Sequence, residues 1–224
     1  MRAITRKTIL VLVGGAMVLA LAGVAGAGNG SGNKNGDFEM GDFTKWVTYC
    51  DVCWTTPGDP GGNWFVSGKK ETPINKFSWF GPMQKEFEAV TDEDSHATMV
   101  LTRTVSLGKG SRINFDLEWN NQAGVWCDPG TLNPNDFCGT PNPFNQQIWI
   151  DLQPVGADPF LKGGPDTAKT LWHTQDSTAT KQGKTQLRFD LGKLSGKYVF
   201  RVAVVAGEFY LNVGIDEFSV NNGG

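Results

Sequence analysis

The sequence carries little charge and almost no histidine. Only 19% of its 224 residues are charged, and its two histidines, His96 and His173, lie in dissimilar contexts. Neither a G-x-S-x-G elbow nor an H-E-x-x-H pair occurs, which argues against a serine hydrolase and a zinc hydrolase. The formal net charge is −3 and no run of Lys or Arg is present. Because a line of phosphates needs a line of cations, we expect no nucleic-acid partner.

Turn-forming and aromatic residues are abundant instead. The chain is 39% hydrophobic and holds 29 Gly, 14 Phe and 8 Trp. This composition argues against a disordered chain, a coiled coil and a bundle of long helices. No window shows an amphipathic helix with caps at both ends, since Gly and Pro interrupt most spans of that length. The composition therefore predicts an all-β protein.

The first 27 residues have the pattern of a secretory signal peptide. Arg2, Arg6 and Lys7 precede an apolar stretch over 9–24, and Ala-Gly-Ala at 25–27 is typical of a cleavage site. The alternative, an uncleaved membrane anchor, is disfavoured because the stretch is short for a bilayer. We expect a protein that is secreted or loosely held at the cell surface, without membrane contact after cleavage. Cleavage removes three basic residues and no acidic ones, which leaves a net charge of −6.

The rest of the chain is predicted to form one domain. Residues 28–34 are a Gly/Asn/Ser linker without apolar residues, and the domain spans residues 35–224. No internal repeat is visible, which disfavours a solenoid or a propeller. A domain of this size buries enough surface for a complete hydrophobic core.

Apolar residues alternate with polar ones over several short stretches. Met99, Leu101, Val105 and Leu107 share one face, and Ile113, Phe115, Leu117 and Trp119 repeat the pattern after a turn at 108–110. We predict an antiparallel hairpin there. Further alternating runs are Ile148, Ile150, Leu152; Leu187, Phe189, Leu191; Tyr198, Phe200, Val202, Val204; and Phe209, Leu211, Val213, Ile215. Strands with one apolar face pack best as two antiparallel sheets, so we predict a β-sandwich, with a closed barrel as the alternative.

An even number of cysteines in an exported chain favours two disulfides. Of the three possible connectivities we favour Cys50 with Cys53 and Cys127 with Cys138, because each pair lies in one loop-like segment rich in Gly, Pro and Asp. The alternatives are a redox pair at Cys50 and Cys53, or a zinc site made by all four thiols. The first lacks the βαβ setting and the second lacks another closely spaced pair.

The two ends of the domain resemble a known family. Asn35-Gly36-Asp37-Phe38-Glu39 through Trp46 is similar to the opening N-G-x-F-E segment of galactose-binding-like jelly rolls, a class with many secreted carbohydrate-binding modules. The segment 213–220, V-G-I-D-E-F-S-V, resembles their closing strand. Segments 145–152 and 196–202 also fit strands of such domains. The resemblance implies a jelly-roll sandwich and leaves the ligand open, since one fold carries many functions.

The same resemblance implies a structural calcium ion. In jelly rolls of this type the opening Glu and the closing Asp often meet at calcium, and the matching residues here are Glu39 and Asp216, with Asp37 as a helper. Such oxygen ligands from distant strands would tie the first strand to the last. The alternative is that these acids only form turns or face solvent at strand ends.

Sugar binding needs a flat aromatic ring with amides and carboxylates beside it. Trp149 points away from the apolar face of its strand, next to Gln147 and Asp151. Trp126 lies in a loop beside a cysteine and is a second candidate ring. We predict a carbohydrate site made of these four residues. The alternative is that the rings fill the core, as we expect for Trp46 and Trp119.

Enzyme activity is a weaker hypothesis. A glycosidase needs two carboxylates about 5–10 Å apart, which Asp116, Glu118 and Asp151 would supply if their strands shared a sheet face. Carboxylates on such a face are usually only solvated, and we expect the same of the acidic run at 92–94. We therefore expect a non-catalytic protein that binds an extracellular polysaccharide or glycan. The alternative is a structural or adhesive surface protein without a small-molecule ligand.

Overall fold

The computed structural model describes residues 36, 38–53, 61–76, 81–94, 96–139, 143–163, 167–174 and 180–222. These residues belong to one compact unit, residues 33–224. They form strands and loops without an α-helix. The strands are β1 Val47–Cys50, β2 Gly62–Ser67, β3 Glu88–Glu93, β4 Ala97–Leu107, β5 Arg112–Asn121, β6 Gln146–Pro154, β7 Lys169–His173, β8 Gln182–Asp190, β9 Gly196–Ala206 and β10 Leu211–Asn221.

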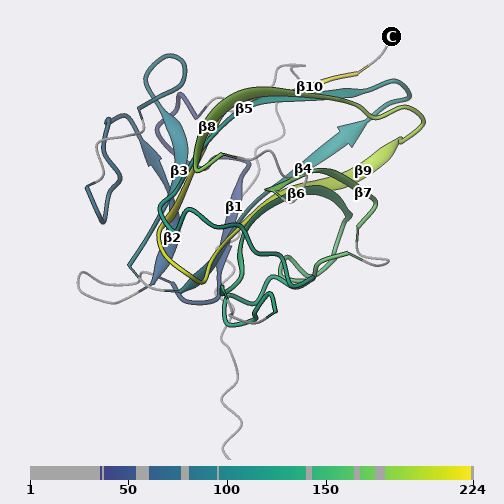
Figure 1. The fold of residues 1–224 in the computed structure, drawn as a ribbon. Coiled ribbons are helices and arrows are strands. Elements are labelled where there is room, and N and C mark those ends of the chain that lie inside the picture. The colour runs from purple at the N-terminus through teal and green to yellow at the C-terminus, as the bar shows by residue number, and fades with distance from the viewer. Residues whose placement is uncertain are drawn as a thin grey trace, which may run out of the picture. The chain divides into compact units, whose positions relative to one another are not determined.

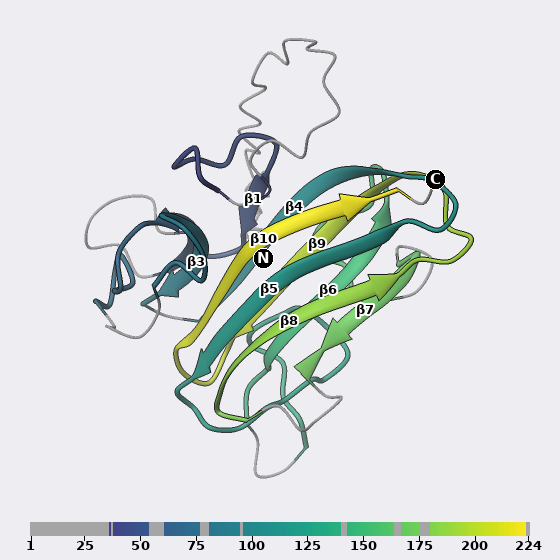
Figure 2. The ribbon, with the colours of Figure 1, turned by 90° about the horizontal axis from the view of Figure 1, so that it is seen from above.

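The strands make two antiparallel sheets of five. Sheet A has the order β1-β4-β9-β6-β7, and sheet B has the order β2-β3-β10-β5-β8. The sheets lie face to face, with β5, β8 and β10 over β4, β6, β7 and β9 (Figures 1 and 2). The predicted all-β sandwich is therefore confirmed. Within the described residues, no helix is long and apolar enough to cross a membrane.

The predicted alternation places the core between the sheets. The apolar faces of β4, β5, β6, β9 and β10 all contribute to one buried cluster, which also contains Trp46 and Trp119 as predicted. One polar residue interrupts the apolar face of β4. Arg103 is buried there, and its guanidinium lies 5.2 Å from the ring centre of Trp46 and 5.3 Å from that of Phe218. These aromatic faces supply the favourable surroundings that a buried cation requires.

The predicted hairpin at 99–119 is wrong. β4 pairs with β1 and β9 in sheet A, whereas β5 pairs with β10 and β8 in sheet B. The turn at 108–110 carries the chain from one sheet to the other, and Gly110 has a φ of 78° there. The apolar faces of the two strands consequently face each other across the core instead of lying side by side in one sheet.

The two ends of the domain meet in the core. Phe218 donates its backbone N–H to the carbonyl oxygen of Gly36 at 2.9 Å, and a Cβ at Gly36 would lie 2.0 Å from the Phe218 oxygen. Only glycine allows this approach. The register of β10 shifts between Asp216 and Ser219, where Glu217 has a φ of 50°. This β-bulge turns Phe218 inward, where its ring lies 5.1 Å from the ring of Trp46.

Candidate functional site

Loops cover the outer face of sheet A, on which the predicted sugar site lies. Trp149 on β6 is half-buried and packs with Tyr49 and Phe160 around a second apolar cluster. The ammonium of Lys162 lies 4.2 Å from the centre of the Trp149 ring and donates to Gln147 Oε1 at 2.6 Å. Trp149 therefore lies beneath the loop that follows β6, and a cation already occupies one face of its ring.

Asp151 and Gln147 are also buried under these loops. Asp151 is fully buried, and its carboxylate accepts two hydrogen bonds from Arg201, at 2.9 and 2.7 Å. Arg201 also donates to the carbonyl oxygens of Pro159 and Leu161, which ties the loop to the sheet. Gln147 is 1% exposed. Removing either member of such a buried ion pair costs about 3–5 kcal/mol, so the geometry gives Asp151 a structural role.

The structure does not bring Trp126 to Trp149. Trp126 packs against the main core between the sheets, whereas Trp149 packs on the outer face of sheet A. The other described tryptophans are Trp46, Trp64, Trp119 and Trp172, and all six are buried or half-buried. Trp54 and Trp79 lie outside the described residues. An exposed tryptophan platform is therefore absent from the described part of the chain.

The carboxylates considered for glycoside hydrolysis are separated in the same way. Asp116 and Glu118 lie on β5 in sheet B, and Asp151 lies on β6 in sheet A. Asp116 accepts hydrogen bonds from the side-chain amides of Gln84 at 2.8 Å and Gln186 at 3.1 Å. The condition that both strands share a sheet face is consequently not met.

Glu118 meets a second acid, Glu88, on the outer face of sheet B. Both side chains are buried, and the two carboxylate oxygens of Glu88 have no hydrogen-bond partner among the described residues. Burial, reinforced by the negative charge of Glu118, raises the pKa of Glu88 to about 9. Burial raises the pKa of Glu118 to about 7, although Lys184 opposes this. At neutral pH the pair therefore retains a proton.

Glu39 and Asp216, the predicted calcium ligands, both bind the segment 84–87. Glu39 Oε1 accepts the backbone N–H groups of Glu86 and Phe87 at 3.1 and 3.2 Å, and Asp216 Oδ2 accepts that of Gln84 at 3.0 Å. Burial raises the pKa of Asp216 to about 7. No group of three or more His, Cys, Asp or Glu among the described residues is arranged to hold a metal, and Asp37 lies outside them. Calcium at Glu39 and Asp216 stays a prediction.

A pocket of about 210 Å³ opens where the chain crosses between the sheets, at the β3–β4 and β9–β10 turns. This end pocket is lined by Glu93, Asp94, His96, Ala206, Glu208, Phe209 and Tyr210. Phe209 is 54% exposed, and its ring centre lies 4.6 Å from that of Tyr210. Asp94 and Glu208 are exposed at the rim. The pocket thus combines exposed aromatic rings with polar groups that can bind hydroxyls.

Glu93 forms part of the floor of the end pocket. It is 1% exposed, and its Oε1 accepts the backbone N–H of Leu211 at the start of β10. Burial raises the pKa of Glu93 well above its ordinary value. The expectation that 92–94 is a solvated turn is wrong for Asp92 and Glu93, which are buried at the end of β3, and right only for Asp94.

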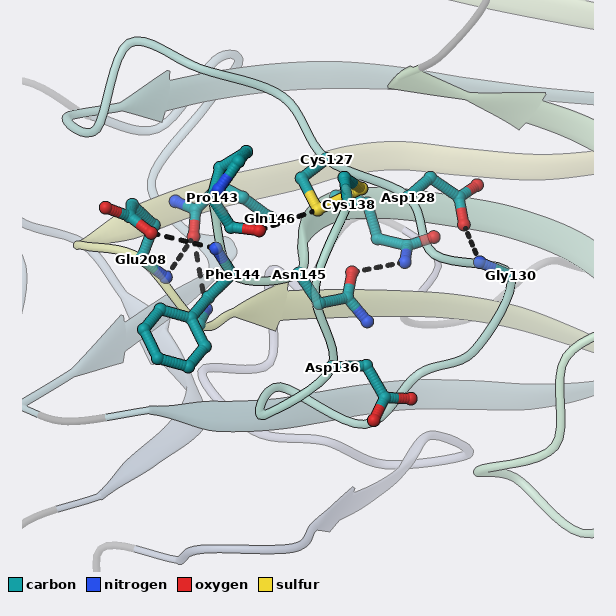
Figure 3. The surroundings of a disulfide bond; sticks show 12 residues. Cys127, Asp128, Gly130, Asp136, Cys138, Pro143, Phe144, Asn145, Gln146 and Glu208 are labelled. Atoms are coloured by element: carbon teal, nitrogen blue, oxygen red, sulfur yellow. Dashed lines mark hydrogen bonds between the residues drawn. A yellow bond between two sulfur atoms is a disulfide. The ribbon is translucent and has the colours of Figure 1, made fainter. Parts of the chain in front are cut away.

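The Cys127–Cys138 disulfide holds the loop beside the end pocket. Both predicted disulfides are present, Cys50–Cys53 and Cys127–Cys138. Just beyond the second, Phe144 donates its backbone N–H to Glu208 Oε2 at 2.9 Å, so the loop is joined to the β9–β10 turn (Figure 3). The Phe144 ring lies 4.9 Å from His96, which lines the pocket.

The end pocket could not be predicted from the sequence. Phe209 continues an alternating run with Leu211, which predicts a strand position, but β10 begins only at Leu211. Glu208, Phe209 and Tyr210 lie where one alternating run ends and the next begins. This position is the sequence signal that could have located the pocket. Aromatic residues in such a connection cannot be buried by the strand pattern, so some of their surface stays exposed.

Comparison with known proteins agrees with the fold. No family model matches the chain, and no curated protein matches it by sequence. The K3 cleaved adhesin domain of Lys-gingipain from Porphyromonas gingivalis W83 is similar, with a TM-score of 0.50 and 16% identity over 84% of this chain and 97% of that one.

Two carbohydrate-binding modules are also among the similar structures. A family 61 module solved with β-1,4-galactotriose has a TM-score of 0.44 and 16% identity over 84% of this chain and 95% of its own. The CBM22-1 xylan-binding domain from Paenibacillus barcinonensis has a TM-score of 0.39 and 10% identity over 83% and 90%. Such low identities bear on fold alone. The chain is a two-sheet antiparallel β-sandwich, a fold similar to that of the K3 adhesin domain.

Proposed function

We propose that the mature chain is a secreted, non-catalytic domain that binds an extracellular polysaccharide at the end pocket. The proposal rests on the lining of this pocket. It holds two accessible rings, those of exposed Phe209 and half-exposed Tyr210, and the polar side chains beside them are Glu208, Asp94 and His96. A pyranose has an apolar face that packs on aromatic rings and hydroxyls that bind carboxylates and imidazole. A second pocket, lined by residues between Val66 and Lys76, has no aromatic residue in its lining.

The site proposed from the sequence is replaced by this one for a physical reason. The Trp149 ring is partly covered by Lys162 from the loop at 155–163, which is tied to the sheet by the buried Arg201. Opening it would expose Asp151 and Asp128, which are paired with those cations. The end pocket needs no such opening, because Phe209 and Glu208 already face solvent.

Secretion and the absence of catalysis belong to the same proposal. Support for secretion comes from the pattern of residues 1–27 and from the two disulfides, which persist in oxidising compartments. Support for a binding function without catalysis comes from the absence of a hydrolase motif in the sequence. The domain would attach to neutral polymers outside the cell.

A retention assay tests the proposal. The mature protein is passed over a panel of insoluble and immobilised polysaccharides, together with the variants Phe209→Ala and Leu161→Ala. Leu161 is 50% exposed in the loop after β6, so it matches Phe209 in exposure but lies outside the pocket. We expect the protein and L161A to be retained by at least one neutral polymer and F209A to be lost from it.

Three outcomes would overturn the proposal or part of it. If no polymer retains the protein, the sandwich is better explained as a structural or adhesive unit without a sugar ligand. If the protein releases reducing ends from a retained polymer, and Glu118→Gln or Asp116→Asn abolishes this, the non-catalytic part is wrong. Equal retention of F209A and the unaltered protein would move the site elsewhere.

A further inference from the structure

A row of rings leads away from the end pocket. His96 lines the pocket, the ring of Phe144 lies 4.9 Å from His96, and the ring of Phe137 lies 4.6 Å from Phe144. Phe137 is 49% exposed, close to the 54% of Phe209. Two solvent-exposed phenylalanines, Phe209 and Phe137, therefore lie at the two ends of one feature, which consists of the pocket and two further rings, those of Phe144 and Phe137.

The residues Phe137 and Phe144 are attached to the sandwich by several contacts. Phe137 and Phe144 form a β-bridge with each other, and Phe137 directly precedes Cys138 of the Cys127–Cys138 disulfide. The backbone N–H of Gly207 donates to the carbonyl oxygen of Asn145 at 2.9 Å. A Cβ at Gly207 would lie 2.1 Å from the carbonyl oxygen of Pro134, so this close packing requires glycine.

These contacts fix the two ring sets relative to each other. Glu208 and Gly207 lie in the turn that also carries Phe209, and both are bonded to the loop that carries Phe144. The bond between Glu208 and Phe144 is seen directly in Figure 3. A surface whose rings are held in place before the ligand arrives loses little entropy when it binds.

The charged residues at the rim of the end pocket are acidic. Asp94 and Glu208 are exposed at its rim, and neither Lys nor Arg is among its described lining residues. A sugar that carries a carboxylate would be repelled at the rim, and no cation would compensate. The rim therefore favours neutral sugars over uronic acids.

Resting on the proposed function, we propose that the end pocket continues across Phe144 to Phe137 as a second aromatic subsite, so that the ligand is an extended chain of neutral sugars. The first sugar packs in the pocket against Phe209 and Tyr210, and later units of the same chain stack on Phe144 and Phe137. A single terminal sugar would leave the second pair of rings unused.

Titration calorimetry with oligosaccharides of increasing length tests this proposal. The probes are β-1,4-linked gluco-, manno-, xylo- and galacto-oligosaccharides of one to six units. We expect the affinity for one series to rise at least tenfold with length. Phe137→Ala and Phe137→Leu should abolish the rise and leave binding of the shortest bound member unchanged, whereas Phe137→Tyr, which keeps the ring, should retain it. Phe209→Ala should weaken binding at every length.

The outcomes separate this inference from the proposed function. If no oligosaccharide binds, the proposed function fails with it. If oligosaccharides bind but affinity is independent of length, or if F137A and F137L keep the full rise, only the second subsite is refuted. Melting temperatures of the variants show whether they are folded. F137L keeps a large apolar side chain at this exposed position, so its loss of the length dependence can be assigned to the missing ring.

The same calorimetry tests the expected preference for neutral sugars over uronic acids. Oligogalacturonides should bind at least tenfold more weakly than the best neutral series. The double variant Asp94→Asn and Glu208→Gln should narrow this gap, and the new amide side chain at position 208 would retain an oxygen that can accept the N–H of Phe144. Equal affinity of the unaltered protein for neutral and uronic chains would contradict the specificity.

Discussion

The buried pair Glu88 and Glu118 makes the stability of the domain dependent on pH. Both pKa values lie above 4.5, the value in an unfolded chain, at about 9 and about 7. A group with a raised pKa stabilises the folded state when it is protonated, and this contribution is lost as the pH rises through the folded-state value. Ionisation of both carboxyls would place two negative charges side by side in a buried position, and the nearby cation, Lys184, is half-exposed and 3.8 Å from Glu118 Oε2.

We therefore predict that the melting temperature falls from about pH 5 to about pH 9. Glu88→Gln should reduce this fall, because a neutral amide can donate to the carboxylate of Glu118. The gain at about pH 8 should be about 1–3 kcal/mol, the usual cost of an unsatisfied buried polar group. Thermal unfolding followed by circular dichroism over this pH range measures both effects.

Asp190→Asn is the matched control. The Asp190 carboxylate is 71% exposed and pairs with Arg112 at the surface, where an ion pair contributes little. This variant should reproduce the pH profile of the unaltered protein. A profile of E88Q that runs parallel to that of the unaltered protein would show that Glu88 does not hold a proton in the folded state.

At the residue scale, the sequence predicts apolar residues better than charged ones. Trp46 and Trp119 are in the core as expected, because a large apolar ring has one favourable environment. Glu93 and Asp151 are expected at the surface, yet each is buried with a partner distant in sequence, Leu211 or Arg201. A charged residue can be buried once it is paired, and its own neighbours in the sequence do not reveal the pairing.

Among the structural elements, the loop closed by Cys127–Cys138 has the most direct effect on the candidate site. It carries Phe137, and it is followed by Phe144, which is bonded to Glu208. Cross-linking such a short loop stabilises a domain by about 3 kcal/mol through the unfolded state. The bond therefore contributes both to stability and to the position of the rings.

Replacing both cysteines, Cys127→Ala with Cys138→Ala, should lower stability by about 2–3 kcal/mol. It should also weaken retention on the bound polysaccharide, because Phe137 loses its fixed neighbour. Cys50→Ala with Cys53→Ala is the control, since neither of these cysteines is among the residues that line the pocket. Unchanged retention of the first double variant would show that the disulfide does not position the site.

The assignment of strands to sheets could not be predicted from alternation. Alternation indicates which face of a strand is apolar, and it does so for β4 and β5. It contains no information on which strand is the hydrogen-bonded neighbour, because either arrangement buries both apolar faces. The expected hairpin is wrong for this reason, and the condition that β5 and β6 share a sheet face could not be judged from the sequence either.

For the molecule as a whole, the meeting of the two chain ends is the most informative prediction. The resemblance at Gly36–Trp46 and at 213–220 implies it, and the contacts among Gly36, Trp46 and Phe218 confirm it. Glu39 and Asp216 reinforce the junction by binding the same segment, 84–87. The location of a ligand does not follow from the fold, because it depends on loops that close over one face and leave another open.

Calcium binding at Glu39 and Asp216 can be tested on the whole domain. If an ion binds there, chelation should lower the melting temperature and added calcium should restore it, since a ligand of the folded state stabilises that state. Asp216→Asn should abolish the response. An unchanged melting temperature under both treatments would end the calcium assignment.

Residue-resolved NMR tests most directly whether a sugar binds at the end pocket. The mature protein is titrated with an oligosaccharide from the polymer that retains it. We predict that the amide shifts concentrate at 93, 94, 96, 137–139, 144 and 207–210. Shifts concentrated around Trp149 and the loop at 155–163, with none at Phe209, would contradict it.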